Sequence, residues 1–433
     1  MQTEDGYRGI WYYNQPTNDQ YVYKYSGGLG TYCAKHIPLA VYAPEVEKTF
    51  FCYGGTAKDQ NRLLHMVSYY DHRTGTVPRP TLLIDKQTDD AHDNPVLCID
   101  PDGFIWVFSS AHGLSRPAYI FKSRTPYAVD EFELVREQNY SYPQPWYIPG
   151  RGFLFLHTLY LKSPTQRRLF WSTSPDGRAW SEPQMLAHIQ WGHYQVSWRS
   201  GHTVGTGFNV HPAEIGCNYR TNLYYLQTSD FGETWTTVDG RPVTTPLTQV
   251  DNPALIRDYR AEGRLAYMKD LNFDASGNPI ILHVVAATWK PGKGGPRQWM
   301  IAHWTGSQWV FRQVTTSDSC YDTGCLHVEP DGTWRIIGPT QPGPQPGNPG
   351  GEMAVWTSTD QGANWTMLRQ ITAGSTLNHT YARRPVDAHP DLYALWADGH
   401  GRQPSDSHLY VCDKDGRNVR RLPHHMPGEF ADL

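Results

Sequence analysis

A recurring turn motif is the strongest constraint on how this chain folds. The pattern Ser/Thr-x-Asp-x-Gly-x-x-Trp occurs at 228–235 and 358–365, and a copy at 173–180 has its Asp shifted by one position. In such a motif Asp accepts hydrogen bonds from the turn backbone, Gly supplies a positive φ angle, and Trp packs beneath the turn. Each copy therefore predicts a β-hairpin.

The spacing of these hairpins indicates a repeat. Trp180, Trp235 and Trp365 are separated by 55 and 130 residues, which fits a unit of about 55–65 residues with one decayed copy in between. The 433-residue chain then holds about seven units. Plainer Asp/Gly turns between short apolar runs fill the gaps, at 100–103, 274–277, 329–332 and 413–416.

Composition supports a β-rich fold. The chain has 16 Trp, 27 Tyr and 14 Phe, together with 39 Gly and 33 Pro. Aromatic residues favour pleated sheets, while Gly and Pro mark turns and interrupt helices. We predict an all-β fold: a single seven-bladed β-propeller over residues 1–433, with the Pro/Gly-rich stretch 339–351 as a surface loop rather than a linker.

Charge and hydropathy exclude several classes of function. The 38 basic and 42 acidic side chains give a net charge of −4, so there is no general attraction for nucleic acid. No apolar stretch approaches the roughly 20 residues of a membrane-spanning helix, and the N-terminus has no export signal. Seven scattered cysteines predict core thiols or a metal site rather than a disulfide framework.

The repeated turns resemble the Asp box, or BNR repeat, of sialidase-like propellers. This motif supports the fold and takes no part in catalysis, so function has to come from other residues. The resemblance implies an Arg-Ile-Pro motif near the start of a true sialidase, but the corresponding segment here reads Tyr7-Arg8-Gly9-Ile10. A sialidase is therefore disfavoured.

Longer strings resemble one subgroup of BNR proteins, namely ulvan lyases, rhamnosyl-glucuronate lyases and an unusual α-L-rhamnosidase family. They are segments 8–12, 25–36, 89–95, 141–147 and 217–222. The resemblance runs from about Arg8 to Cys412 and implies a substrate in which rhamnose is linked to a uronic acid. It implies a lyase that breaks this linkage by β-elimination, with no organic cofactor.

A uronate lyase needs a group that neutralises the carboxylate, a base for the C5 proton and an acid for the leaving oxygen. His92 and His112 lie at predicted strand ends, where propellers gather functional loops. The resemblance aligns them with the two active-site histidines of ulvan lyases. Because imidazole titrates near neutrality, we expect one to act as base and the other as acid or carboxylate ligand.

Tyrosines and arginines supply the other candidates. Tyr142 and Tyr219 are candidate phenols for proton transfer, and Gln144, beside Tyr142, is a candidate substrate contact. Arg220 and one of the pair Arg167 and Arg168 are candidates to clamp the carboxylate. Only one of the pair can point inward from a strand, and we expect Arg168. Leu159 stands where the family often has an arginine.

His36 belongs to a segment that resembles the rhamnosidase branch, which uses a histidine on the opposite face of the propeller. We therefore treat His36 as a second candidate substrate contact, on the other face. Retention of both His92 and His112 favours the lyase face.

A metal site is also predicted. Histidine and cysteine donors of the kind that zinc prefers occur at His211, Cys217, Cys320, Cys325 and His327, although their spacing matches no short zinc motif. The resemblance implies a structural zinc. Segment 270–274 alternates oxygen ligands as calcium loops do, but it lacks the Gly and Glu of an EF-hand, so we expect a hairpin turn there.

The leading hypothesis is a monomeric polysaccharide lyase that binds an anionic, rhamnose-containing polysaccharide. An exo-acting α-L-rhamnosidase is the alternative among enzymes, and a non-catalytic carbohydrate-binding propeller is the alternative outside them. Because a polymer of this kind is too large to enter cells, we expect the protein in the periplasm or outside the cell.

Overall fold

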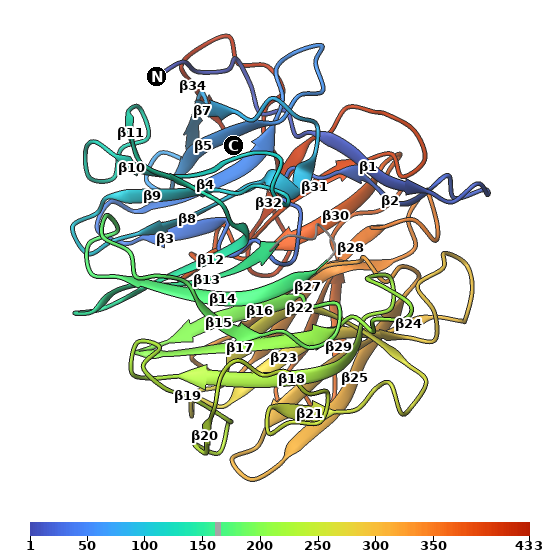
Figure 1. The fold of residues 1–433 in the computed structure, drawn as a ribbon. Coiled ribbons are helices and arrows are strands. Elements are labelled where there is room, and N and C mark those ends of the chain that lie inside the picture. Colours follow the sequence, from blue (N-terminus) through green and yellow to red (C-terminus); the bar gives the residue numbers. More distant parts are fainter. Residues whose placement is uncertain (161–165) are drawn as a thin grey trace.

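The computed structural model describes residues 1–160 and 166–433. Seven antiparallel sheets of four or more strands follow one another in these residues, and each forms one blade of a ring (Figure 1). The all-β, seven-bladed β-propeller predicted from the repeats is confirmed. Helix in the described residues is limited to one 3-10 turn, η1 (Ala91–Asp93).

The first three blades occupy the N-terminal part of the chain. Blade 1 consists of β3 (Ala40–Ala43), β4 (Lys48–Gly55), β5 (Leu64–Asp71), β6 (Thr76–Pro78), β7 (Thr81–Asp85) and β34 (Phe430–Asp432). Blade 2 consists of β8 (Pro95–Ile99), β9 (Ile105–Ser109), β10 (Ala118–Ser123) and β11 (Phe132–Gln138). Blade 3 consists of β12 (Ser141–Ile148), β13 (Gly152–Tyr160), β14 (Arg167–Ser174) and β15 (Gln184–Ala187).

The other four blades complete the ring. Their strands are, in blade 4, β16 (Gln195–Ser200), β17 (Thr203–Val210), β18 (Thr221–Thr228), β19 (Trp235–Thr236), β20 (Pro242–Val243) and β21 (Leu255–Arg257); in blade 5, β22 (Leu265–Phe273), β23 (Pro279–Ala286), β24 (Arg297–Trp304) and β25 (Trp309–Ser317); in blade 6, β26 (Cys325–Val328), β27 (Trp334–Gln341), β28 (Glu352–Ser358) and β29 (Thr366–Gln370); and in blade 7, β30 (Asn378–Arg383), β31 (Ala394–Gly399), β32 (Leu409–Cys412) and β33 (Val419–Arg421).

The ends of the chain meet in blade 1. β34, the last strand, pairs with β6 in antiparallel register, so the C-terminus lies near the N-terminus (Figure 1). A separate hairpin, β1 (Trp11–Pro16) and β2 (Tyr23–Gly28), covers the centre beside blade 7. That residues 1–433 behave as one domain stays a prediction, which a single cooperative unfolding transition would support.

The Asp-box turns have the predicted geometry. Asp176, Asp230 and Asp360 each accept hydrogen bonds from backbone N–H groups of their own turns at 2.8–2.9 Å. All three turns join the third and fourth strands of their blades. The copy that decayed between 235 and 365 corresponds to the β24–β25 hairpin of blade 5, where Thr305 and Gln308 close the turn instead.

Two segments outside the Asp boxes differ in how closely they follow the sequence pattern. The turn at 274–277 joins β22 to β23, as expected, and Asp274 accepts from the backbone N–H groups of Ser276 and Asn278. The stretch 339–351 is a loop only from 342 onward. Its first residues extend β27, because Pro339 keeps register with Met353. No helix in the described part of the chain is long and apolar enough to cross a membrane.

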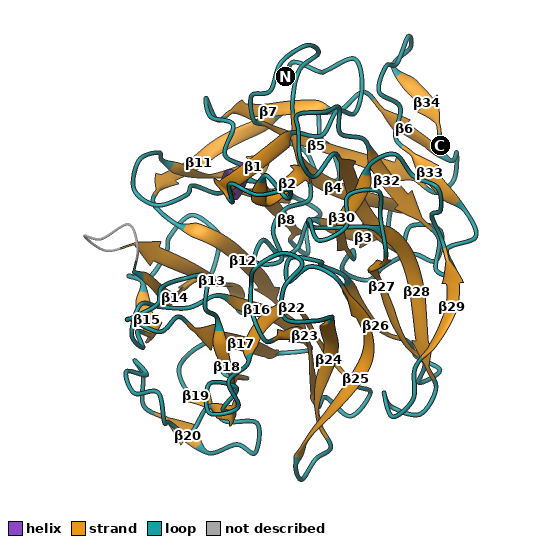
Figure 2. Ribbon diagram, turned by 90° about the vertical axis from the view of Figure 1, so that its right-hand side faces the viewer, coloured by secondary structure: helices purple, strands orange, loops and turns teal. Residues whose placement is uncertain are grey.

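The innermost strands of the blades face a common centre (Figure 2), and their direction defines the two ends of the ring. β8 begins and β9 ends at the same place, since Pro95 pairs with Ser109. We call this end, which carries η1 and the loop after β9, the histidine face. The turns at 100–103 and 175–180 lie at the other ends of these blades, which we call the Asp-box face.

Candidate active site

The two predicted histidines meet on the histidine face. Their imidazole rings are stacked, with centroids 4.0 Å apart and an angle of 15° between the planes. His92 lies in η1, and its side chain is only 4% exposed, whereas the His112 side chain is 25% exposed. The pair therefore presents one buried and one accessible imidazole.

Asp90 holds both rings in place. One of its carboxylate oxygens lies 2.6 Å from Nδ1 of His92, and the other lies 2.7 Å from Nδ1 of His112. Asp90 also caps η1 by accepting from the backbone N–H of His92. Because the carboxylate engages Nδ1 of each ring, any proton exchange with a substrate has to use Nε2.

Burial and charge tune this cluster. Burial, and after it the charge of His112, lowers the pKa of His92 to about 4 against the opposing effect of Asp90. Burial alone would raise the pKa of the Asp90 carboxyl, but its contacts with both histidines hold that pKa far below its ordinary value. At neutral pH the cluster thus contains an ionised Asp90 and a neutral His92.

Phenols surround the histidine pair. The hydroxyl groups of Tyr25 and Tyr32 lie 2.9 and 2.7 Å from Nε2 of His92, so that nitrogen is already engaged. On the His112 side, the rings of Tyr142 and Tyr160 lie 6.3 and 6.0 Å from the imidazole. His112 is therefore the imidazole whose Nε2 is placed to meet a substrate.

Tyr142 reaches the centre through a β-bulge. The register of β12 against β13 shifts between Ser141 and Gln144, and Tyr142 has a φ of 54°. Such a bulge redirects a side chain and is common beside active sites. The hydroxyl of Tyr160, on β13, donates to that of Tyr142 at 3.4 Å, so the two phenols form a pair.

Arg167, and not Arg168, points toward the centre. Its guanidinium lies 5.4 Å from the ring centroid of Tyr160 and 5.2 Å from that of Tyr194. Arg168 is half-buried and donates to Gln166. The prediction of Arg168 is wrong because Arg167 pairs with Tyr160 on β13, whereas Arg168 pairs with Leu159, and it is the Tyr160 side that faces inward.

Arg220 lies at the centre, as predicted. Its guanidinium is 4.4 Å from the ring centroid of Tyr194, 4.8 Å from that of Tyr267 and 5.3 Å from that of Tyr321. Tyr219 is half-buried beside it. Within the described residues no hydrogen bond or ring contact joins Tyr219 to the histidine pair, so the structure does not bring this candidate into the cluster.

A small central cavity adjoins the phenols and the cations. Its volume is about 20 Å³, which is room for about one water molecule. It is lined by five tyrosines and three basic residues, together with small residues: Tyr32, Tyr142, Tyr194, Tyr321, Tyr381, Lys35, Lys269, Arg220, Cys33, Ala34 and Thr323. Several cations beside an aromatic wall suit a small anionic group such as a carboxylate.

The lysines around this centre have lowered pKa values. Burial, followed by the charge of Arg220, lowers the pKa of Lys24 to about 7. Burial also lowers the pKa of Lys269 to about 7 and holds that of Lys35 well below its ordinary value. A bound anion would relieve this repulsion, so the centre is prepared for negative charge.

Two predicted substrate contacts are buried instead. Gln144 is 0% exposed, and its amide donates to the carbonyls of Lys35 and Gln195 while its oxygen accepts from Ser197. Its hydrogen-bonding groups are therefore engaged in joining blades 3 and 4 to the loop before blade 1. His36 is also 0% exposed, and its ring lies 5.6 Å from that of Tyr142. The expectation that His36 serves the opposite face is wrong, because it precedes β3 at the same end as His92.

The five predicted metal ligands are not brought together. Among the described residues, two groups of three donors lie close enough to share an ion, and neither contains any of the five. Cys325 and His327 are neighbours, with 3.8 Å between Sγ and Nε2, but His327 stacks on Tyr393. Cys320 instead donates to the carbonyl of Thr288.

The other two members of that set lie in blade 4 and its loop. The His211 ring packs against Tyr194, and Cys217 is half-buried with a pKa that burial raises but three neighbouring cations bring below its ordinary value. The predicted ligand set fails because its members lie on different blades. The expectation of a hairpin turn at 270–274 is wrong for its first four residues, because 270–273 continue strand β22. Asp270 pairs there with Arg384 at 2.8 Å.

Comparison with solved structures shows the fold. The chain superposes on an ulvan lyase of polysaccharide lyase family PL25 bound to -[GlcA(1-4)Rha3S]- with a TM-score of 0.74, 16% identity and 97% coverage of both chains. Another structure of a PL25 ulvan lyase gives a TM-score of 0.73 at 16% identity, covering 96% of this chain and 97% of that one. Polysaccharide lyase Uly1 gives 0.63 at 12% identity, covering 96% and 100%.

Comparison of sequences gives the family. No curated protein sequence matches the chain. The model of the BNR repeat-containing family matches residues 49–317, which is more than half of the chain and includes both histidines. This match agrees with the Asp-box turns and the ring of seven blades, and the chain therefore belongs to the BNR repeat-containing family.

Proposed function

We propose that the protein is a polysaccharide lyase that cleaves a rhamnose–uronic acid linkage by β-elimination. The observation that carries the proposal is the position of His112. Its imidazole is fixed by Asp90, partly exposed, and placed beside buried phenols and an arginine that together meet the three needs of the reaction. The likeness in fold to ulvan lyases supports the same reaction class.

The first requirement is to neutralise the uronate carboxylate. Arg167 and Arg220 both lie against Tyr194, beside the cavity lined by Lys35 and Lys269. Burial lowers the pKa of both lysines. A guanidinium matches a carboxylate through two parallel hydrogen bonds. Binding of the carboxylate there would make the C5 proton more acidic by stabilising the charge that develops when it leaves.

The second requirement is the base, and we assign it to Nε2 of His112. Asp90 accepts the Nδ1 proton and so orients the ring and stabilises the imidazolium that forms. His92 shares Asp90, and with its pKa of about 4 it stays neutral, so it positions Asp90 and Tyr32 rather than competing for the proton.

The third requirement is an acid for the leaving oxygen, and we assign it to the Tyr142 and Tyr160 pair. Burial raises the pKa of Tyr160 to about 12 although Arg167 opposes this effect, so the phenol is protonated at neutral pH. Arg167 would stabilise the phenolate as the proton leaves, which suits general-acid catalysis.

The geometry gives little support to the two alternative functions, a rhamnosidase and a non-catalytic carbohydrate-binding protein. The α-L-rhamnosidase hypothesis relied on His36, which is fully buried. A purely carbohydrate-binding propeller would not need an imidazole pair bridged by a carboxylate. We also propose that the protein acts outside the cytoplasm, where such polymers occur.

Product mass separates the three functions. Ulvan and, separately, rhamnosyl-glucuronate side chains of gum arabic are incubated with the protein, and the oligosaccharides are analysed by mass spectrometry. Elimination yields a new end that is one water lighter than a hydrolysis product. Products with the mass expected from hydrolysis would overturn the lyase proposal. Binding of a uronate polymer without any cleavage of it would overturn the proposal as well.

A further inference from the structure

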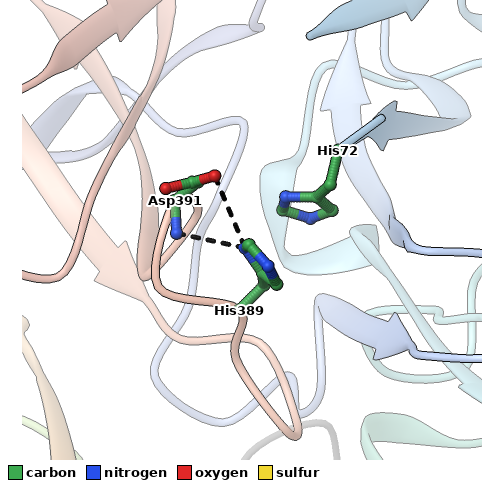
Figure 3. A group of neighbouring side chains, drawn as sticks. All are labelled: His72, His389 and Asp391. Carbon is green, nitrogen blue, oxygen red and sulfur yellow. Dashed lines mark hydrogen bonds and ion pairs between the residues drawn. The ribbon is translucent and has the colours of Figure 1, made fainter. Parts of the chain in front are cut away.

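A second cluster of metal-binding side chains lies on the Asp-box face, away from the histidine pair. It consists of His72, at the end of β5 in blade 1, and His389 and Asp391, on the loop between β30 and β31 in blade 7 (Figure 3). One donor atom from each residue lies within 4.8 Å of the others. Blade 1 and blade 7 are the first and last blades, so the cluster spans the closing seam of the ring.

We propose that these three residues bind a first-row divalent cation, Zn²⁺ in particular, that joins blade 1 to blade 7. Two imidazoles and one carboxylate form a recurrent ligand set for such ions, with a remaining coordination position for water. This site is distinct from the predicted histidine and cysteine set, and it does not depend on the proposed lyase activity.

The imidazoles are already arranged as two ligands of one ion would be. Their ring centroids are 4.0 Å apart and the planes are inclined by 46°, so they converge without the flat stacking seen at His92 and His112. The Asp391 carboxylate lies 3.8 Å from Nδ1 of His389. In Figure 3 the three side chains converge from two different parts of the chain.

His72 has the supporting contact expected of a ligand. Its Nε2 lies 2.8 Å from the hydroxyl of Thr49, whereas its buried Nδ1 has no hydrogen-bond partner among the described residues. Metal-bound histidines commonly donate their second N–H to a neighbouring oxygen, which fixes the ring and the tautomer. Donation from Nε2 to Thr49 would leave the lone pair of Nδ1 for the ion.

The backbone around the site is held in place before any ion binds. The N–H of Asp391 donates to Nδ1 of His389 at 3.2 Å, and the N–H of His72 donates to the carbonyl of Glu47. Tyr42 joins the blades through the carbonyl of Val386, and its ring contacts both histidines. Little further ordering is therefore needed for an ion to bind.

The exposure of the cluster is compatible with an ion arriving from solvent. The side chains of His389 and Asp391 are 28% and 55% exposed, respectively, and His72 is half-buried behind them. An ion at this position would add a link between two blades that already share an apolar cluster, with Phe51 from blade 1 and Leu395 and Val411 from blade 7. The same blades are joined by the bridge between Val41 and Val386 and by a hydrogen bond from Arg420 to Tyr70. Binding would stabilise the closed ring by mass action.

The test measures zinc binding by the full chain after treatment with a chelator. Titration calorimetry with Zn²⁺ compares the wild type with His389→Gln and Asp391→Asn. We expect each substitution to weaken one binding event by about 100-fold or more, and Thr49→Val to weaken the same event by about 10–100-fold. His425→Gln is the matched control, because His425 contacts Asp5 on the surface without a third donor.

A crystal soaked in Zn²⁺ gives the location directly. The proposal requires an anomalous scattering peak between His72, His389 and Asp391. Equal zinc affinity and stoichiometry in wild type and His389→Gln, or a peak only at Asp90, His92 and His112, would overturn it. Lyase turnover should be the same in His389→Gln and wild type, so failure of this proposal and failure of the proposed activity are distinguishable.

Discussion

Stacked imidazoles of His92 and His112, with centroids 4.0 Å apart, share a single carboxylate, that of Asp90. Two imidazoles so close repel each other when both are protonated, and the shared Asp90 compensates for one positive charge only. Asp90 therefore fixes the orientation of both rings, and it leaves Nε2 of His112 for the substrate.

Substitution of Asp90 by Asn tests this relationship. An amide keeps the shape of the side chain but cannot orient both imidazoles or stabilise an imidazolium. We expect kcat/KM on a uronate polymer to fall by about 10²–10⁴-fold. The matched control is Asp89→Asn, on the neighbouring exposed residue, and it should retain nearly full turnover. Equal activity of the two variants would contradict the role of Asp90.

The arginine pair allows a test of which strand face is functional. Arg167→Lys keeps the charge beside Tyr160 and Tyr194 but loses the planar fork, so turnover should fall by about 100-fold. Arg168→Lys is the control, since Arg168 bonds to Gln166. Steady-state kinetics on the same polymer compares them, and a larger loss in Arg168→Lys would show that the inward residue has been misassigned.

Acid should destabilise the fold through buried histidines. Burial lowers the pKa of His157 to about 4 from an ordinary 6.5, so above pH 6.5 the group is neutral in both the folded and the unfolded state. Between these pH values only the unfolded state binds the proton, and the free energy of unfolding falls as pH falls. The loss from His157 by pH 4 is about 3 kcal/mol.

His157→Phe should remove this contribution, because the ring lies between Phe155 and Phe170. Urea unfolding at several pH values between 7 and 4 measures the effect. Compared with the wild type, the variant should show a shallower pH dependence, while His202→Phe, at an exposed turn, should not. A slope unchanged by His157→Phe would mean that this histidine is not neutral in the fold.

The Asp-box turns should be sensitive to a side chain at their glycine. Gly232 has a φ of +87°, and an added Cβ would lie 2.7 Å from Nε1 of Trp171. Gly240 has a φ of +83°, and no described atom lies within 4 Å of such a Cβ. Gly240→Ala isolates the backbone strain, of about 1 kcal/mol, and Gly232→Ala should cost about 1–3 kcal/mol more.

Chemical denaturation of the two glycine variants provides the comparison. If they lose equal stability, then Trp171 moves aside and the packing beneath the box contributes little. If Gly232→Ala is the more stable, the account of the turn is incorrect.

Much of the fold was predictable because the Asp box is a local device. Ser or Thr, Asp, Gly and Trp within eight positions determine a hairpin without help from distant residues, and their spacing gives the number of blades. The histidines were identified by the resemblance to the active-site histidines of ulvan lyases. Their position at the ends of predicted strands agreed with it, since strand ends of successive blades meet on one face.

The remaining site residues depend on long-range geometry. Tyr25, Tyr32 and Tyr194 reach the centre from a hairpin, a loop and blade 4. Segment 25–36, with Tyr25 and Tyr32, carries part of the family resemblance, but nothing in its pattern says that these hydroxyl groups meet His92. Asp90 had a usable signal, since it stands two positions before His92 and can cap the same turn. We missed it because carboxylates beside turns are common.

The predictions of Arg168 as the inward arginine and of the five metal ligands were wrong for different physical reasons. Side chains alternate along a strand, so only one of two adjacent arginines can face inward. Which one does so depends on the register between β13 and β14, in which Arg167 pairs with the inward-facing Tyr160, 7 positions earlier. The histidine and cysteine donors share a chemistry without sharing a location. The cluster of His72, His389 and Asp391 could not be predicted for the same reason, because His72 is distant from the other two residues in the sequence.

The most direct test of the central claim is the ultraviolet absorbance of the unsaturated uronate during incubation with ulvan. The measurement compares the wild type with His112→Asn, and binding of the polymer is measured for both. We expect a steady rise with wild type, and with His112→Asn a rise slower by about 10²–10⁴-fold at similar binding. A rise of equal rate with both proteins, or released rhamnose with no rise, would contradict it.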